Sequence, residues 1–175
     1  MSQLPEELLR PLGLLTYRWS GLEVMVELMC AYLFSKGLNG SATKAPPKPF
    51  KSRLKFITRC LRLPMFAHIE PELSLIITRC HELSTERNRA VHAVFIGRSE
   101  HFDAQHIRVI VSDNGYYADA VNSLTPDYMT ELANRIARQF SALFNLLDRL
   151  KAILRCYEGE QDIGRRASLN AGGPA

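Results

Sequence analysis

Apolar side chains recur at intervals of three and four residues along most of the chain, a spacing that places them on one face of an α-helix. The first stripe lies between Pro11 and Lys36, or begins at Pro5 with a bend at Pro11, and consists of Leu12, Leu15, Trp19, Leu22, Val26, Met29 and Leu33. It predicts a long amphipathic helix that ends before Gly37. Residues 38–49 contain three prolines and no periodicity, so we expect a mobile loop there.

The second predicted helix, residues 50–62, carries an apolar stripe and a separate basic one. The apolar stripe consists of Phe50, Leu54, Ile57 and Leu61. The other, which we call the basic edge, consists of Lys51, Lys55, Arg59 and Arg62. The basic edge is either an ordinary solvated helix face or a surface for an anionic partner, and the pattern alone fits both.

A third helix is predicted from Pro71 onward, with a stripe formed by Leu73, Ile76, Cys80, Leu83, Val91 and Val94. One charged residue interrupts this stripe, because Arg87 lies within about 20° of Ile76 around the helix axis. A guanidinium in a buried stripe costs several kcal/mol unless it is paired. Glu23 lies at the edge of the first helix's stripe, so we expect it to pair with Arg87.

Beyond Gly97 the pattern changes from helical spacing to alternation. The segments HIRVIV and YYADAV flank Asn114-Gly115, a pair suited to a tight turn, and predict a β-hairpin at about residues 106–121. The segment AVFI at 93–96 is a candidate third strand. We therefore expect a small β insertion in a mainly α protein.

The last predicted helix starts with a cap signal, Thr125 followed by Pro126 and Asp127. Its stripe runs for about eight turns and consists of Met129, Leu132, Ile136, Phe140, Leu143, Leu147, Leu150 and Leu154. Most of this seam is core, although Phe140, Phe144 and Leu147 could also meet a partner subunit. The tail 158–175 has few large apolar residues and is expected to be disordered, which leaves one domain over residues 1–157.

Composition narrows the function classes only slightly. The 175 residues include 22 Lys and Arg against 18 Asp and Glu, a formal charge of +4 that leans toward anionic partners. The four cysteines have no paired spacing and follow no secretory leader, so we expect a reducing cytoplasm. The most apolar run, residues 22–34, contains two glutamates and is too short to span a bilayer.

Signals of several enzyme classes are missing from the sequence. It contains no phosphate-binding G-x-x-x-x-G-K-[ST], no G-x-S-x-G and no H-E-x-x-H. The histidines show no metal-ligand spacing, so we expect neither a metal nor a cofactor. What remains is the segment around Arg87, in which Asn88 and His92 are four residues apart on one helix face. An amide at this spacing can fix the tautomer of the imidazole, although the same pair is also common as a plain helix-end contact.

The hexamer RNRAVH at residues 87–92 resembles the signature of HEPN domains: an Arg, a polar residue, and a His a few positions later near the end of a late helix. The first helix, with RWSGLEVMVELM at 18–29, and the long closing helix are also similar to that family. The resemblance covers most of residues 11–155. It implies an antiparallel bundle of four to five helices.

The resemblance further implies a metal-independent endoribonuclease whose two motifs face each other across a homodimer cleft, in a toxin or defence setting with an antitoxin protein as a further partner. On this sequence His92 would transfer the proton, Arg87 would hold the scissile phosphate and Asn88 would orient His92. Glu23 would support Arg87, and the basic edge with Arg89 would bind RNA. Members of the family that have lost catalysis act as binding modules, which is the alternative reading.

One departure concerns the toxin subtype. HEPN toxins that pair with nucleotidyltransferase antitoxins carry a tyrosine two residues after the histidine, whereas this chain has Val94 there. Regulation through that tyrosine is therefore not expected here.

Overall fold

The computed structural model describes the backbone of residues 6–38, 44–92, 94–99, 102–112, 115–121 and 124–171, and the side chains of residues 6–38, 44–92 and 124–159. Residues 39–43 of the expected loop, Asn114 of the expected turn and residues 172–175 lie outside this description. The chain is mainly helical, as the spacing of apolar residues predicted.

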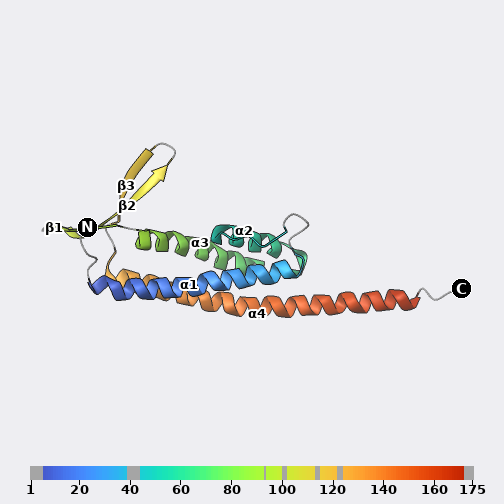
Figure 1. The fold of residues 1–175 in the computed structure, drawn as a ribbon. Coiled ribbons are helices and arrows are strands. Elements are labelled where there is room, and N and C mark those ends of the chain that lie inside the picture. Colours follow the sequence, from blue (N-terminus) through green and yellow to red (C-terminus); the bar gives the residue numbers. More distant parts are fainter. Residues whose placement is uncertain are drawn as a thin grey trace.

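Four α-helices form the body of the molecule (Figure 1): α1 Glu6–Ser35, α2 Phe50–Leu61, α3 Glu70–His92 and α4 Pro126–Ala171. A short 3-10 helix, η2 Pro64–Phe66, joins α2 to α3. The predicted start of α4 is confirmed, because the backbone N–H of Tyr128 donates to the Thr125 hydroxyl at 3.1 Å. This is the bond that an N-cap threonine makes to an otherwise unsatisfied donor of the first turn.

Helices α1, α2 and α4 run in the same direction. Arg18, in the first half of α1, bonds Asn134 in the first turns of α4. Lys36, just past the end of α1, bonds Glu158 much later in α4, at 2.8 Å. Between α1 and α2, Trp19 meets Phe50 and Glu27 meets Arg53, so the positions of contact advance together in both helices.

Only α3, among these four α-helices, runs the opposite way. Gln139 of α4 donates to the Ile76 carbonyl at 2.8 Å, whereas Arg135, one turn earlier, pairs with Glu86, which is later in α3. The resemblance implied alternating antiparallel neighbours, and α1 and α2 depart from that pattern. The long connection before Phe50 allows this, since an extended chain covers about 3.3–3.6 Å per residue.

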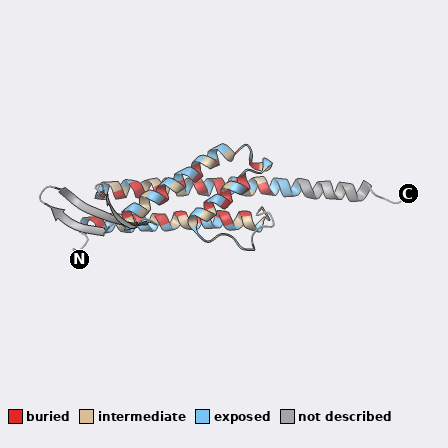
Figure 2. Cartoon of the chain, turned by 90° about the horizontal axis from the view of Figure 1, so that it is seen from above, coloured by how far each residue is buried: buried red, intermediate tan, exposed pale blue. Residues whose placement is uncertain are grey.

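The core lies between the helices, where α1, α2 and α4 present their predicted stripes (Figure 2). The stripe predicted for α3 extended too far, since this helix ends at His92 and Val94 belongs to β1. Leu15, Leu22, Leu54, Ile57 and Leu132 are among its fully enclosed side chains. Gln139 is a buried polar exception that is satisfied by its bond to α3. Because an unpaired buried amide costs free energy, this bond ties α4 to α3 at a defined register.

Three antiparallel strands follow α3: β1 Val94–Ser99, β2 Phe102–Ser112 and β3 Gly115–Val121. In the sheet β2 lies between the other two, and its register with β3 runs from His106↔Val121 to Ser112↔Gly115. The two segments whose alternation predicted strands fall within β2 and β3.

Helix α4 is longer than the sequence predicted, since it continues to Ala171 where we expected a disordered tail from residue 158. Past the end of α1 it projects beyond the other helices (Figure 1). Residues 155–159 are all exposed. A helix that is already anchored gains one backbone hydrogen bond for each further residue, so propagation needs no apolar stripe.

Candidate functional site

The residues of the predicted motif lie at the C-terminal end of α3, where the helix ends at His92. Arg87, Asn88 and Val91 are partly buried there, whereas Arg89 and His92 are exposed. The helix therefore presents two different sides at its end. Arg87 points into the bundle and His92 lies on its surface, as expected for residues about 140° apart around a helix.

Arg87 lies over the indole ring of Trp19 in α1. The guanidinium carbon is 5.5 Å from the ring centroid, within the range in which a cation is attracted to an aromatic face. Arg87 Nη1 also donates to Asn88 Oδ1 at 3.0 Å. The indole in turn packs against Phe50, the first residue of α2, at 5.0 Å between centroids. Three helices thus meet around this guanidinium.

Two buried donors at this point have no acceptor. Within the described residues, Arg87 Nε and Trp19 Nε1 are enclosed and make no hydrogen bond. Leaving such a group unsatisfied costs about 1–3 kcal/mol, more when it is charged. The stacked pair of Arg87 and Trp19 is therefore held by packing, while these two nitrogens make no hydrogen bond in the isolated chain.

The expected ion pair between Arg87 and Glu23 is not formed among the described residues. Glu23 is partly buried on α1, one turn after Trp19. Because the aromatic face of Trp19 receives the guanidinium, the carboxylate of Glu23 is left outside this contact. Spacing along each helix could place both residues near the interface but could not choose between them.

Asn88 and His92 do not form the expected pair. The Asn88 side chain turns to Arg87, and the His92 ring makes no hydrogen bond to any described residue. Asn88 consequently fixes one end of the guanidinium rather than the imidazole.

Sequence reasoning missed a second network, centred on Glu86. Its carboxylate accepts hydrogen bonds from both terminal nitrogens of Arg135, at 2.7 and 2.8 Å, and from the hydroxyl of Tyr128, at 3.3 Å. Burial, followed by the charge of Glu86, raises the pKa of Tyr128. The network anchors the end of α3 to α4. No spacing rule could have found it, since Arg135 is distant from Glu86 in the sequence.

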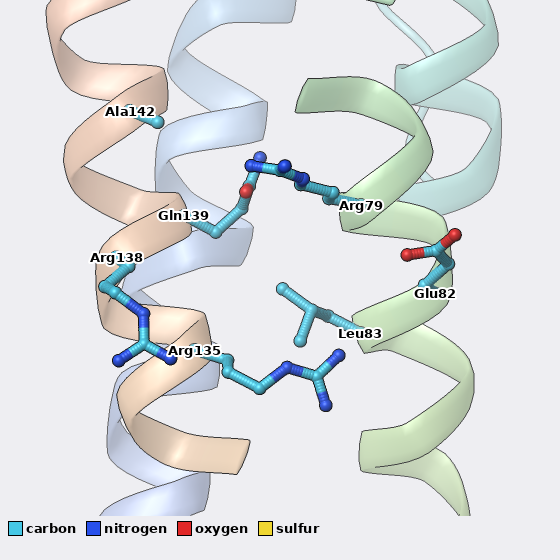
Figure 3. A pocket seen from close by; sticks show the side chains of 7 residues that line it. All are labelled: Arg79, Glu82, Leu83, Arg135, Arg138, Gln139 and Ala142. Atoms are coloured by element: carbon cyan, nitrogen blue, oxygen red, sulfur yellow. The ribbon is translucent and has the colours of Figure 1, made fainter. Parts of the chain in front are cut away.

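A pocket of about 310 Å³ opens beside this network, between α3 and α4 (Figure 3). Its lining includes Arg79 and Glu82 of α3 and Arg135, Arg138 and Gln139 of α4. Arg138 also pairs with Glu131 at 2.7 Å, and both of these side chains are more than half exposed. Three arginines and one glutamate line the pocket, but Arg135 and Arg138 are already paired with Glu86 and Glu131, which neutralises most of its positive charge.

The basic edge of α2 is fully on the surface. Lys51, Lys55, Arg59 and Arg62 are all exposed. The edge begins one residue after Phe50, so its first lysine is close to the stack that holds Arg87. Burial, with added repulsion from Lys51 and Lys55, lowers the pKa of His81 in α3. These cations therefore act together on the α2–α3 surface.

The cysteines offer no nucleophile in the core. Cys30, Cys60 and Cys80 are buried, and burial raises the pKa of Cys80 to about 12. The described residues contain no group of three or more His, Cys, Asp or Glu side chains able to hold a metal ion. In the part of the chain that is described, no helix combines the length and apolar character needed to span a lipid bilayer.

Comparison of the chain with models of known protein families, with characterised proteins and with solved structures returned no match. The site must therefore be judged on its own geometry.

Proposed function

We propose that this chain is a metal-independent endoribonuclease of the HEPN type, with β1–β3 as an insertion before its long closing helix. The active site would lie in a cleft between two copies of the chain, and toxin or defence systems with a protein antitoxin are the setting we propose. RNA is the proposed substrate.

The observation that carries this proposal is the state of Arg87. Its guanidinium is stacked on Trp19 and tied to Asn88, yet it has no carboxylate partner among the described residues. A structural arginine at this depth is normally paired. An arginine that holds a phosphate must keep part of its planar fork free of carboxylates, because the same donors bind both groups.

His92 supplies the second requirement of the proposed chemistry. It is exposed at the same helix end, so a ribose 2′-hydroxyl could reach its ring. The imidazole would accept the 2′-proton or donate one to the leaving 5′-oxygen, while Arg87 stabilises negative charge on the phosphoryl oxygens. The products would be a 2′,3′-cyclic phosphate and a 5′-hydroxyl. DNA lacks the attacking hydroxyl and should resist cleavage.

The test compares two exposed histidines. His92→Ala should lower RNA cleavage by about 10²–10⁴-fold, the usual contribution of a proton-transfer residue. His68→Ala is the matched control, since His68 is also exposed and lies near the other end of α3. Both variants should unfold at the wild-type temperature. Cleavage must also persist in excess EDTA, and an activity that requires added metal would contradict the mechanism.

A second candidate function is a binding module without catalysis. The buried, unsatisfied Nε of Arg87 favours this second function, because a phosphate cannot reach that atom. Under this reading His92→Ala changes nothing in a cleavage assay, and the wild-type chain cleaves no RNA. Retention of a 2′-O-methyl oligonucleotide by the wild-type chain would then identify the module's ligand.

A further inference from the structure

The side of α1 that faces away from Arg87 exposes a continuous apolar surface. Tyr17 is 78% exposed, Val24 54% and Leu28 51%, and Phe144 of α4, one turn after Phe140, is 49% exposed. The three α1 residues fall within about 40° around the helix axis. We call these four residues the apolar face. Large side chains gathered in this way mark an interaction surface, whereas single exposed apolar residues are ordinary.

A groove of about 530 Å³ lies between α1 and α4, and Tyr17 and Val24 of the apolar face are among its lining residues. Small residues, Ser20 and Gly21 on α1 and Ala137 and Ser141 on α4, line it together with the ring of Phe140. A Cβ atom at Gly21 would come to 3.7 Å from that ring. Gly21 therefore helps to keep the groove open, because the side chain of any other residue at this position would fill part of the space.

The chemistry of the groove excludes a highly charged ligand. Arg18 is the one cationic residue among its lining residues, and its guanidinium already donates to the side-chain oxygen Oδ1 of Asn134. No other charged side chain lines it in the described part of the chain. Nucleic acid binding needs several free cations, so this groove does not suit a nucleic acid.

We propose that the apolar face binds the same face of a second copy of this chain. A two-fold contact requires one surface to carry both a projecting group and a matching recess. Here Tyr17 is 78% exposed beside a groove of about 530 Å³ that Gly21 helps to line. Each Tyr17 then enters the groove of the other copy, and the exposed part of Phe144 is covered at the rim.

The exposed area of the apolar face supplies part of what such a contact needs. At roughly 150–200 Å² for a whole large apolar side chain, the four residues of the apolar face expose about 400 Å² together. A standard interface buries about 800 Å² from each partner, so these side chains provide about half of it before the groove walls are counted.

This contact is independent of the proposed ribonuclease cleft. Trp19, which holds Arg87, lies about 200° around α1 from Tyr17, so the motif and the apolar face are on opposite sides of that helix. The apolar face alone gives a dimer. If the motifs also meet across a cleft, two different two-fold contacts build an assembly larger than a dimer.

Mass measurement in solution tests the proposal, by sedimentation equilibrium of the full chain over a wide concentration range. Leu28→Glu and Phe144→Asp should each weaken the association by about a hundredfold or more, because each buries an unpaired charge. Leu75→Glu is the matched control: Leu75 lies on α3 and, like Leu28, is 51% exposed. It should leave the mass unchanged.

Three results would overturn the proposal: a monomer at every concentration, an oligomer that Leu28→Glu and Phe144→Asp leave intact, or equal disruption by Leu75→Glu. The first two results would assign the apolar face to a foreign partner. Circular dichroism of each variant shows that a change in mass is not unfolding. RNA cleavage, measured on the same samples, reports separately on the proposed function.

Discussion

The two sides of α1 are incomplete in opposite ways. Toward the bundle, Trp19 and Arg87 place polar nitrogens in an enclosed region without acceptors. Toward solvent, Tyr17 and its neighbours place large apolar groups in water. Both arrangements cost free energy in the isolated chain, the first through unmet hydrogen bonds and the second through exposed apolar area. We therefore propose two different partners, a polar one at the motif and an apolar one on the outer face.

The largest expected effect is on the free energy of unfolding, and it compares substitutions at Trp19 and Tyr17, which are two residues apart on the two sides of α1. Trp19→Ala should lower the free energy of unfolding by about 3–5 kcal/mol, because Trp19 is buried against Phe50 and removing it leaves a cavity. Tyr17→Ala should change it by less than about 0.5 kcal/mol in the monomer, as surface substitutions do. Urea denaturation of both variants at low protein concentration provides the measurement. Equal losses would mean that Tyr17 is part of the core.

A smaller effect distinguishes a partnered arginine from an unpartnered one. Arg53 contacts Glu27 at 3.0 Å and donates to the Pro47 carbonyl, so Arg53→Met should cost about 1–3 kcal/mol. Arg87 lacks such a carboxylate, so Arg87→Met should be neutral or stabilising by about 1 kcal/mol.

Cleavage adds a second measurement to this comparison. Under the proposed function Arg87→Met abolishes RNA cleavage while the chain stays folded, whereas Arg53→Met retains cleavage at temperatures below its own unfolding transition. If Arg87→Met proves as destabilising as Arg53→Met, the guanidinium has a structural partner and the argument for a phosphate fails.

The smallest expected effect is a pH dependence of stability that arises from a buried thiol, that of Cys80. Burial raises the pKa of Cys80 from 9.0 to about 12. A folded-state pKa above the unfolded value means that stability is complete below pH 9 and is lost as pH rises toward 12. The loss is on the order of 1.4 kcal/mol per pH unit. Cys80→Ala should therefore flatten the decline between pH 9 and pH 10 in thermal unfolding scans. Cys156→Ala, which removes an exposed thiol, is the matched control for the loss of a cysteine.

Part of the candidate site could be predicted because it depends on one helix. The three-four spacing of α3 indicates that Arg87 faces the bundle and that His92, five residues later, does not. The cap at Thr125 and the exposed basic edge of α2 were predictable for the same reason. Each follows from the sequence within a few turns, where backbone geometry leaves little choice.

The contacts of the site could not be predicted because several helices compete for the same space. Glu23 and Trp19 are both near the first helix's stripe, and the aromatic ring receives the guanidinium. Asn88 could reach either His92 or Arg87, and it bonds Arg87. Such choices depend on differences of about 1 kcal/mol between alternative pairings, which spacing along one helix does not contain.

By itself the sequence determined where the four helices lie, except that α4 continues past residue 157, and which face of each helix is buried, since the period of the apolar positions sets both. The tertiary structure alone decided that α1, α2 and α4 run in parallel, that Glu86 joins Arg135, and that a groove opens between Gly21 and Phe140. These features arise where surfaces from distant segments meet. Their free energies depend on shape and distance across the interface, and neither is encoded in the local order of residues.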